Sequence, residues 1–278
     1  MSLFITSLNS GSNGNCYYIG NHTEAVLIDA GISCRETNKR MKLLGLSMKN
    51  VKAIFVSHEH TDHIKGAQAI SDNFSIPVYI TNSTLQSCCN IKEGSTKKLF
   101  AYQPVTISGL TVTAFPKHHD AEDPHCFIVS GNGITVGVFT DIGISCDHVT
   151  KHFSQCNAAF LETNYDEELL ETGRYPYYLK KRIRGDKGHL SNNQALEIFT
   201  NHRSSFMSHL FLSHLSKENN CPVKAKKLFD DHAGTTRIII ASRFEQTSVY
   251  KIVNSMSPEL TIAVLKPKQM SLFETNIN

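Results

Sequence analysis

Three histidines and an aspartate occur within six residues, in His58-Glu59-His60-Thr61-Asp62-His63. This run directly follows an apolar stretch at residues 51–56, which is typical of a buried strand. Side chains two positions apart on an extended chain point the same way, so His58 and His60 are placed to bind one ion. Asp62 and His63 come after the chain turns and can serve a second ion close by. Imidazole with carboxylate donors suits Zn²⁺, and also Mn²⁺ or Fe.

The elements that must position this motif are short apolar runs interleaved with amphipathic ones. We expect strands at residues 24–28, 51–56, 77–80, 111–115, 127–129, 133–140, 158–161, 207–212, 237–242 and 249–253. We expect helices at residues 35–44, 64–72, 192–200 and 223–233. Strands that alternate with helices in both halves of the chain predict an α/β protein whose sheets are covered by helices.

Composition narrows the class of protein without naming a substrate. The chain has 278 residues, of which 40% are hydrophobic and 19% charged, and this predicts a globular protein with a substantial core. The net charge of +3 is too small for composition alone to indicate a nucleic-acid-binding protein. The sequence has no apolar run long enough to cross a membrane and no signal-peptide pattern. With eight cysteines and no C-x-x-C pair, it predicts a cytoplasmic protein with reduced thiols and no membrane partner.

The His-x-His-x-Asp-His motif after a strand resembles the signature of the metallo-β-lactamase fold superfamily, and the resemblance extends over residues 3–253. Four single residues match the other motifs of that superfamily in order: Asp29, His119, Asp141 and His214. His119 is preferred over its neighbour His118 because it begins the triplet His-Asp-Ala. The resemblance implies a four-layer αβ/βα sandwich of two mixed sheets flanked by helices, formed here by one catalytic domain at residues 1–253.

The resemblance also implies two divalent metal ions, Zn or Mn, with Fe as a further option. The first ion would be held by His58, His60 and His119. The second would be held by Asp62, His63 and His214, with Asp141 bridging the two. Asp29 would brace the metal-binding loop from behind, and Asp62 counts among the catalytic residues as well as among the ligands.

Two further motifs point to a phosphodiester substrate. Glu162 follows an apolar strand, and His189 lies in Gly188-His189-Leu190-Ser191, which opens a helix. They resemble the paired Glu and His of the phosphodiesterase branch that includes tRNase Z, where the His protonates the leaving oxygen and the Glu orients it. The chemistry is sensible, because an alkoxide leaving group needs a proton. The alternatives are that His189 only stabilises the helix start and that Glu162 is an ordinary exposed carboxylate.

The motifs that span the chain are most similar to the YycJ/WalJ exonuclease group. They include Ser10-Gly11-Ser12-Asn13-Gly14-Asn15, Gly188-His189-Leu190-Ser191-Asn192 and His214-Leu215-Ser216-Lys217-Glu218. The resemblance implies a two-metal 5′-to-3′ exonuclease acting on DNA in repair or replication. One position departs from the pattern, because Tyr165 stands where a His is expected, and a phenol cannot replace an imidazole near neutral pH. The Ser10–Asn15 loop either contacts phosphate or is a plain turn.

Charge is concentrated just before His189. Residues 174–187 carry six Lys or Arg against one Asp, interleaved with three tyrosines. We expect this strip to bind nucleic acid, and DNA in particular, because cations attract phosphates and tyrosines can stack on unpaired bases. The candidate contacts are Lys180, Lys181, Arg182 and Arg184. The alternative is a helix face that is simply solvated.

Two other functions remain open from the sequence. A small-molecule hydrolase on the same fold, acting on a thioester, lactone or cyclic phosphodiester, would use the same metal ligands. A non-catalytic metal-binding adaptor is the other, and the complete set of seven ligands disfavours it.

Residues 254–278 are expected to form a linker and tail. The segment Gln269-Met270-Ser271-Leu272-Phe273 resembles the short peptides by which bacterial replication and repair proteins bind the DNA sliding clamp. In that interpretation Met270, Leu272 and Phe273 fill an apolar pocket and Gln269 forms hydrogen bonds. The alternative is that Leu272 and Phe273 fold back onto the catalytic domain.

Overall fold

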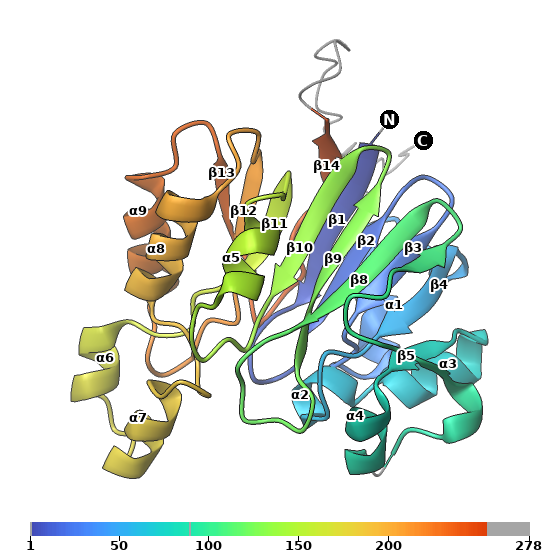
Figure 1. Ribbon diagram of the computed structural model, residues 1–278, viewed down its shortest axis with the longest axis horizontal. Coiled ribbons are helices and arrows are strands. Elements are labelled where there is room, and N and C mark those ends of the chain that lie inside the picture. Colours follow the sequence, from blue (N-terminus) through green and yellow to red (C-terminus); the bar gives the residue numbers. More distant parts are fainter. Residues whose placement is uncertain (1, 89, 255–278) are drawn as a thin grey trace, which may run out of the picture.

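Two seven-stranded sheets form the interior of the molecule, and helices cover the outer face of each (Figure 1). The structure is a computed structural model that describes residues 2–88 and 90–254. The four layers confirm the predicted fold class. The proposed clamp-binding peptide at residues 269–273 lies outside the described residues, and so does the predicted tail from residue 255 onward.

The first sheet contains the N-terminal strands together with the last strand of the described chain. From β14 to β3 neighbouring strands are antiparallel, and from β3 to β6 they are parallel, so the sheet is mixed. In spatial order its strands are β14 (Tyr250–Val253), β1 (Ser2–Asn9), β2 (Cys16–Gly20), β3 (Ala25–Ile28), β4 (Val51–Phe55), β5 (Val78–Ile80) and β6 (Thr96–Lys98).

The second sheet repeats this plan. From β7 to β10 neighbouring strands are antiparallel, and from β10 to β13 they are parallel. In spatial order its strands are β13 (Arg237–Ile240), β12 (His209–Ser213), β11 (Ala158–Glu162), β10 (Ile134–Phe139), β9 (His125–Gly131), β8 (Leu110–Pro116) and β7 (Val105–Ile107).

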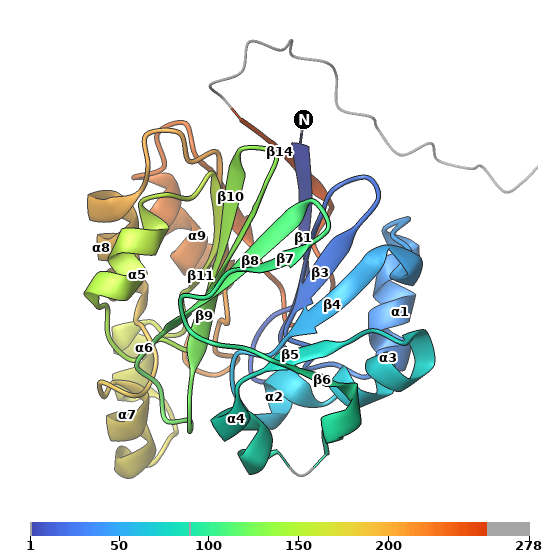
Figure 2. The same ribbon diagram turned by 45° about the vertical axis from the view of Figure 1, so that its right-hand side comes forward.

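The helices divide between the two outer faces, as the turned view in Figure 2 shows. On the side of the first sheet lie α1 (Cys34–Leu43), α2 (Thr61–Ile64), α3 (Ala67–Phe74), α4 (Asn82–Ser87) and the 3₁₀ turns η1 (Met48–Asn50) and η2 (Glu93–Ser95). On the side of the second lie α5 (Asp147–Phe153), α6 (Glu167–Thr172), α7 (Tyr177–Ile183), α8 (Asn192–His202) and α9 (Pro222–Asp230). Helix α7 has no buried residue and projects at one end of the molecule with α6 (Figure 1).

Three apolar clusters fill the spaces between layers. The central cluster joins the inner faces of the sheets and includes Phe55, Phe127, Phe160 and Phe211. Two outer clusters join each sheet to its helices. Burying a phenylalanine side chain stabilises the folded state by about 1.5–3 kcal/mol. Because each sheet packs against the other sheet on one face and against helices on the opposite face, its strands can be buried on both faces.

The helix expected at residues 64–72 is divided into α2 and α3. Gly66 separates them, and an added Cβ there would lie 2.1 Å from the carbonyl oxygen of Ile32. From residue 67 onward the predicted helix is present as α3. The close approach of the Gly66 and Ile32 backbones interrupts it before that residue. The Gly131-Asn132-Gly133 turn predicted for the hairpin joins β9 to β10, with positive φ at Asn132 and Gly133.

Candidate metal centre and active site

The predicted metal ligands, Asp29, Glu162 and His189 meet at one end of the two sheets. All of them except His189 lie at or just after the ends of strands β3, β4, β8, β10, β11 and β12, from both sheets, whereas His189 precedes α8. Three of these positions have left-handed backbone without being glycine: φ is 59° at Asp29, 54° at Asp141 and 57° at His214. Such strain is retained where the surrounding structure fixes it, and it turns these side chains sharply out of their strands.

Asp29 holds the loop that carries the histidine motif. Its Oδ1 accepts a hydrogen bond from the Ser57 backbone N–H at 2.8 Å, and its Oδ2 accepts one from the Ser57 hydroxyl at 2.9 Å. His63 Nδ1 lies 2.7 Å from Asp29 Oδ2. A proton on that Nδ1 fixes the ring orientation and leaves Nε2 free to bind a metal ion. Asp29 therefore lies where a brace for the loop is needed.

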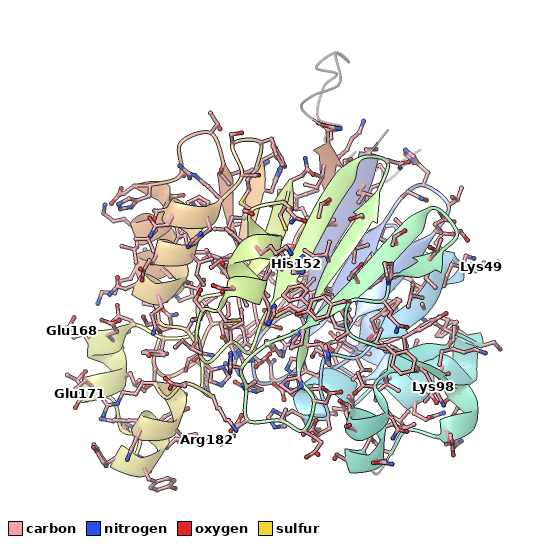
Figure 3. All side chains as sticks on the ribbon, viewed as in Figure 1. Lys49, Lys98, His152, Glu168, Glu171 and Arg182 are labelled. Atoms are coloured by element: carbon pink, nitrogen blue, oxygen red, sulfur yellow. The ribbon has the colours of Figure 1, made fainter. Side chains whose placement is uncertain are left out.

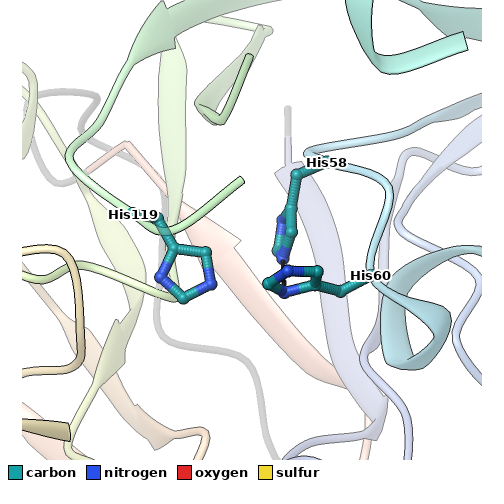
Figure 4. A group of neighbouring side chains, drawn as sticks. All are labelled: His58, His60 and His119. Carbon is teal, nitrogen blue, oxygen red and sulfur yellow. Dashed lines mark hydrogen bonds between the residues drawn. The ribbon is translucent and has the colours of Figure 1, made fainter. Parts of the chain in front are cut away.

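His58, His60 and His119 face one another across the gap between the sheets (Figure 4). His58 Nε2 lies 3.1 Å from His60 Nδ1, and one donor atom from each of the three rings falls within 4.8 Å of the others. His119 is buried, whereas the neighbouring His118 is exposed. Of this pair, His119 is the one that the structure brings into the group.

A second group adjoins the first. Asp62, His63 and His214 have donor atoms within 4.8 Å of one another. Asp141 lies against both groups: its Oδ2 is 3.1 Å from His63 Nε2, and its Oδ1 is 3.4 Å from His214 Nε2 and 3.9 Å from His119 Nε2. Two donor atoms on one tetrahedral zinc ion lie about 3.4 Å apart, so these spacings suit ions seated between the side chains.

Buried polar atoms without partners provide an independent test of whether metal ions fit. Among the described residues, seven buried side-chain atoms have no hydrogen-bond partner, and three of them lie in this cluster: His119 Nε2, Asp141 Oδ2 and His214 Nε2. Buried polar atoms are nearly always satisfied, so three orphans facing one another require an explanation. All three belong to the predicted ligand set, and divalent cations would satisfy them. The donors present therefore fit the metal ions that the sequence suggests.

The electrostatics of the cluster also favour cations. Burial lowers the pKa of His214, but Asp141, Asp62 and Glu162 outweigh it and raise that pKa to about 10. In the same way Asp141 and Asp29 overcome burial and hold the pKa of His63 well above its usual value. The carboxylates thus create a negative potential that stabilises the protonated imidazoles. Metal ions would compete with those protons for the same nitrogen atoms.

Glu162 and His189 lie together at the edge of the cluster. Glu162 Oε1 accepts a hydrogen bond from His189 Nδ1 at 2.8 Å, while Oε2 accepts from the backbone N–H groups of Ile142 and Leu190. Burial raises the pKa of Glu162, but His189 and His214 outweigh it and lower that pKa to about 2. Glu162 is fully buried, so it is not the ordinary exposed carboxylate that the sequence left open.

Several residues at the site were not identified from the sequence. Ser57 links Asp29 to the histidine motif, Asn164 Nδ2 donates to the His214 carbonyl at 2.9 Å, and the Ser10 hydroxyl accepts from the His214 N–H at 2.7 Å. Asn15 is buried with its Nδ2 3.1 Å from His63 Nε2, so part of the Ser10–Asn15 loop supports the cluster. Only Ser10 and Asn15, which both belong to the conspicuous Ser10–Asn15 loop, offered any signal in advance.

Of the four cations predicted to contact nucleic acid, Lys181, Arg182 and Arg184 are exposed and Lys180 is half-buried, on and just after α7, and three of the four have partners. The Arg182 guanidinium pairs with Asp120 at 2.5 Å, Arg184 pairs with Glu171 at 3.0 Å, and Lys180 donates to the Glu171 carbonyl. Figure 3 shows Arg182 and Glu171 on the two neighbouring helices at this end. The acids come from outside residues 174–187, so the local charge of the strip is smaller than the sequence suggests.

Tyr165, which replaces an expected His, is buried beside the start of α8. It forms an isolated β-bridge with Ser191, whose side chain caps α8 in a capping box with Gln194. Burial, together with Glu167 and Glu162, raises the pKa of Tyr165 to about 12. The phenol therefore stays neutral near pH 7.

The four-layer fold and the cluster of metal donors at its open end define the class of metal-dependent hydrolases. The chain belongs to the beta-lactamase superfamily, because the family described as "Beta-lactamase superfamily domain" matches residues 24–214. This confirms the superfamily resemblance seen in the motifs.

Curated relatives extend the similarity over most of the chain. Exodeoxyribonuclease YycJ of Bacillus anthracis is 33% identical over 224 residues, which cover 79% of this chain and 85% of that protein. Exodeoxyribonuclease WalJ of Streptococcus pneumoniae is 30% identical over 219 residues, covering 77% and 81%. Among solved structures, the metallo-beta-lactamase fold protein YhfI from Bacillus subtilis superposes with a TM-score of 0.68 at 16% identity, covering 90% of this chain and all of that one. The last likeness concerns the fold alone.

The described residues contain no helix that is both long and apolar enough to cross a membrane.

Proposed function

We propose that the protein is a two-metal phosphodiester hydrolase, and specifically a 5′-to-3′ exonuclease acting on DNA in repair or replication. The observation that carries the proposal is the Glu162–His189 pair beside three orphaned metal donors. A hydrolase of this fold needs the donors for any substrate, but a positioned imidazole beside them is suited to a poor leaving group. The names of the curated relatives, both exodeoxyribonucleases, support DNA as the substrate.

The residues take the following roles in this proposal. His58, His60 and His119 would hold one ion, Asp62, His63 and His214 would hold the other, and Asp141 would contribute to both. Asp29 holds the loop on which the first donors lie. Zn or Mn ions bound there would supply a water-derived nucleophile at neutral pH and would neutralise charge on the phosphoryl oxygens.

His189 delivers the proton that the leaving oxygen requires. Its Nδ1 is engaged by Glu162, so the opposite nitrogen, Nε2, is the one left to face the substrate. The side chain is 22% exposed, whereas that of Glu162 is fully buried, which places the imidazole at the boundary between the cluster and the solvent. Glu162 orients the ring and does not itself reach the substrate.

The substrate approaches, in this proposal, along α7. Its exposed tyrosines Tyr177 and Tyr178 are 70% and 74% accessible, and Lys181 is exposed beside them. Exposed aromatic rings next to cations can stack on unpaired bases while the cations contact phosphates. Gly188 connects this helix to His189, so a strand bound on α7 would lead toward the candidate proton donor.

One experiment tests the function. Purified protein is supplied with Mn²⁺ or Zn²⁺ and given 5′- and 3′-end-labelled single- and double-stranded DNA and RNA, alongside a lactone and a thioester. We expect degradation of DNA from the 5′ end. The Asp62→Ala variant should abolish it and lower the metal content by one ion per chain, because ligands of one centre act together.

The matched control is His118→Ala, which removes an exposed histidine adjacent to the cluster and should leave both activity and metal content unchanged. Hydrolysis of the lactone or thioester without any nuclease activity would refute the substrate assignment. Two ions retained at full rate in Asp62→Ala would refute the ligand assignment.

A further inference from the structure

A lysine is buried within the candidate metal centre. The Lys117 side chain has no solvent exposure, and it comes two residues before His119. Its Nζ donates a hydrogen bond to the Thr140 carbonyl at 2.7 Å and lies 4.0 Å from Asp141 Oδ2. Burying an ammonium group is costly unless it is compensated, so a lysine at this position needs a reason.

The first consequence of this contact is geometric. Thr140 immediately precedes Asp141, whose backbone has a strained φ of 54°. Thr140 is buried just after the end of β10, so its carbonyl needs a hydrogen-bond donor. By holding that carbonyl, Lys117 fixes the turn that aims the Asp141 carboxylate at His63 and His214.

The second consequence is electrostatic. Lys117 Nζ lies 4.0 Å from Asp141 Oδ2, so its positive charge acts on any cation that the Asp141 carboxylate would hold. Like charges so close to one another repel at the effective dielectric constant of a protein interior.

We propose that Lys117 is a positioning residue with a fixed charge, which aims Asp141 and weakens the affinity of the centre for divalent ions. Without ions, the ammonium balances the Asp141 carboxylate and keeps the centre folded. With ions, it repels them. The inference rests on the proposed metal centre, and it assigns that centre a weaker, more exchangeable binding than its seven donors alone would give.

The sign of the effect separates this role from a merely structural one. A lysine that only packed or anchored a turn would, when replaced, leave the donors disordered and metal binding weaker. A lysine that repels the ions would, when replaced by a neutral side chain of similar length, leave metal binding tighter. Lys117→Met makes this replacement, and Lys97→Met on exposed β6 is the matched control.

The experiment measures the Zn²⁺ and Mn²⁺ affinities of the purified chain by competition with a chromogenic chelator. We expect Lys117→Met to bind at least one ion on the order of tenfold more tightly than the wild type, and Lys97→Met to bind as the wild type does. Unchanged or weaker affinity in Lys117→Met overturns the inference. Absence of metal binding in the wild type would instead refute the proposed function.

A second measurement covers the case in which Lys117→Met does not fold without metal. Asp141→Asn removes the opposite charge, so the double variant Lys117→Met/Asp141→Asn should regain a cooperative thermal transition without ions. If the double variant also lacks that transition while Asp141→Asn alone has it, the balance of charges is refuted. Lys117→Arg, which keeps the charge, should keep the wild-type affinity within a few-fold.

Discussion

At the scale of single residues, Glu162 connects the candidate acid to a candidate metal ligand. One of its oxygens lies 2.8 Å from His189 Nδ1 and 3.0 Å from His214 Nδ1. The other oxygen is fixed by two backbone N–H groups, so the carboxylate cannot turn to favour one ring over the other. The position of His189 is therefore set by the same side chain that orients a metal ligand.

This arrangement predicts the behaviour of His189→Ala. We expect turnover on DNA to fall by about 10²–10⁴-fold, the usual contribution of a general acid. Metal content, measured by elemental analysis, should stay at the wild-type value because His189 is not one of the seven predicted ligands, although one of its ring nitrogens lies within 4.8 Å of donor atoms of Asp141, Glu162 and His214. On a nitrophenyl phosphodiester the loss should shrink, since that leaving group needs no proton. Equal losses on the two substrates would assign His189 to binding instead.

The site could be predicted from the sequence as far as its donors were concerned. The histidine motif is dense enough to stand out, and the single residues Asp29, Asp141 and His214 were found through their order along the chain. Lys117, Ser57 and Asn164 could not be found that way, because each acts through contacts with residues that only folding brings near. A single lysine or serine outside a motif gives no sequence signal of such a role.

At the scale of elements, the loops after strands decide whether the donors meet. Gly31 follows β3, and its N–H donates to the Asn15 carbonyl at 2.8 Å. An added Cβ at Gly31 would lie 1.7 Å from the carbonyl oxygen of Asp62. That oxygen belongs to the backbone of the metal-binding loop, so it cannot move aside without moving the donors.

Gly31→Ala should therefore lower the free energy of unfolding by about 1–3 kcal/mol, the usual cost of overpacking, and weaken metal binding. Chemical denaturation and a metal titration measure the two effects. Gly94→Ala is the matched control, because no atom lies within 4 Å of its added Cβ. If Gly31→Ala bound metal as the wild type does, the loop would be more compliant than its contacts indicate.

Helix α7 carries the second prediction at this scale. Of the four predicted contacts, and within the described chain, Lys181 is the cation that has no ion pair or hydrogen bond from its side chain. Lys181→Ala should reduce the salt dependence of DNA binding by roughly one unit of slope, the amount expected for one phosphate contact. Hydrolysis of a small phosphodiester should be unaffected.

Lys151→Ala, on the exposed face of α5, provides the comparison for Lys181→Ala. Binding isotherms at several salt concentrations, measured by fluorescence anisotropy, give both slopes. Equal salt-dependence slopes in the two variants would support the alternative from the sequence, in which this helix face is simply solvated.

Most strands were placed correctly from the sequence, but β1, β2, β6 and β7 were not expected. Residues 2–9 mix polar and apolar side chains without alternation, although almost all of them are buried. The reason is tertiary, because the Thr6 hydroxyl and the Ser7 N–H both bond to Thr247, on a segment that lies beside them only in the folded chain. Periodicity could not reveal polar residues whose partners are so distant in sequence.

At the scale of the whole molecule, the centre joins the two sheets. His58 and His63 come from the first sheet, whereas His119, Asp141 and His214 come from the second. An ion bound by both groups therefore stabilises the folded chain relative to the unfolded one, in which these donors are far apart.

Metal removal should consequently lower the melting temperature. At an ion concentration 100-fold above the dissociation constant, one site contributes about 2.7 kcal/mol, which raises the melting temperature of a domain of this size by roughly 5–10 °C. Differential scanning calorimetry with and without a chelator measures the shift. Asp141→Asn should show a much smaller shift, and an equal one would place the bound ions elsewhere.

The position of the candidate metal centre between the two sheets has a consequence for the lifetime of the protein in a cell. A protease can cut a folded chain only where the chain unfolds locally. Metal ions bound by donors from both sheets would make the local unfolding of either sheet depend on the other. In a cell short of metal, the protein would first lose its bound ions and would then be degraded by proteases. The abundance of the protein, and not only its activity, would then follow the supply of the ion.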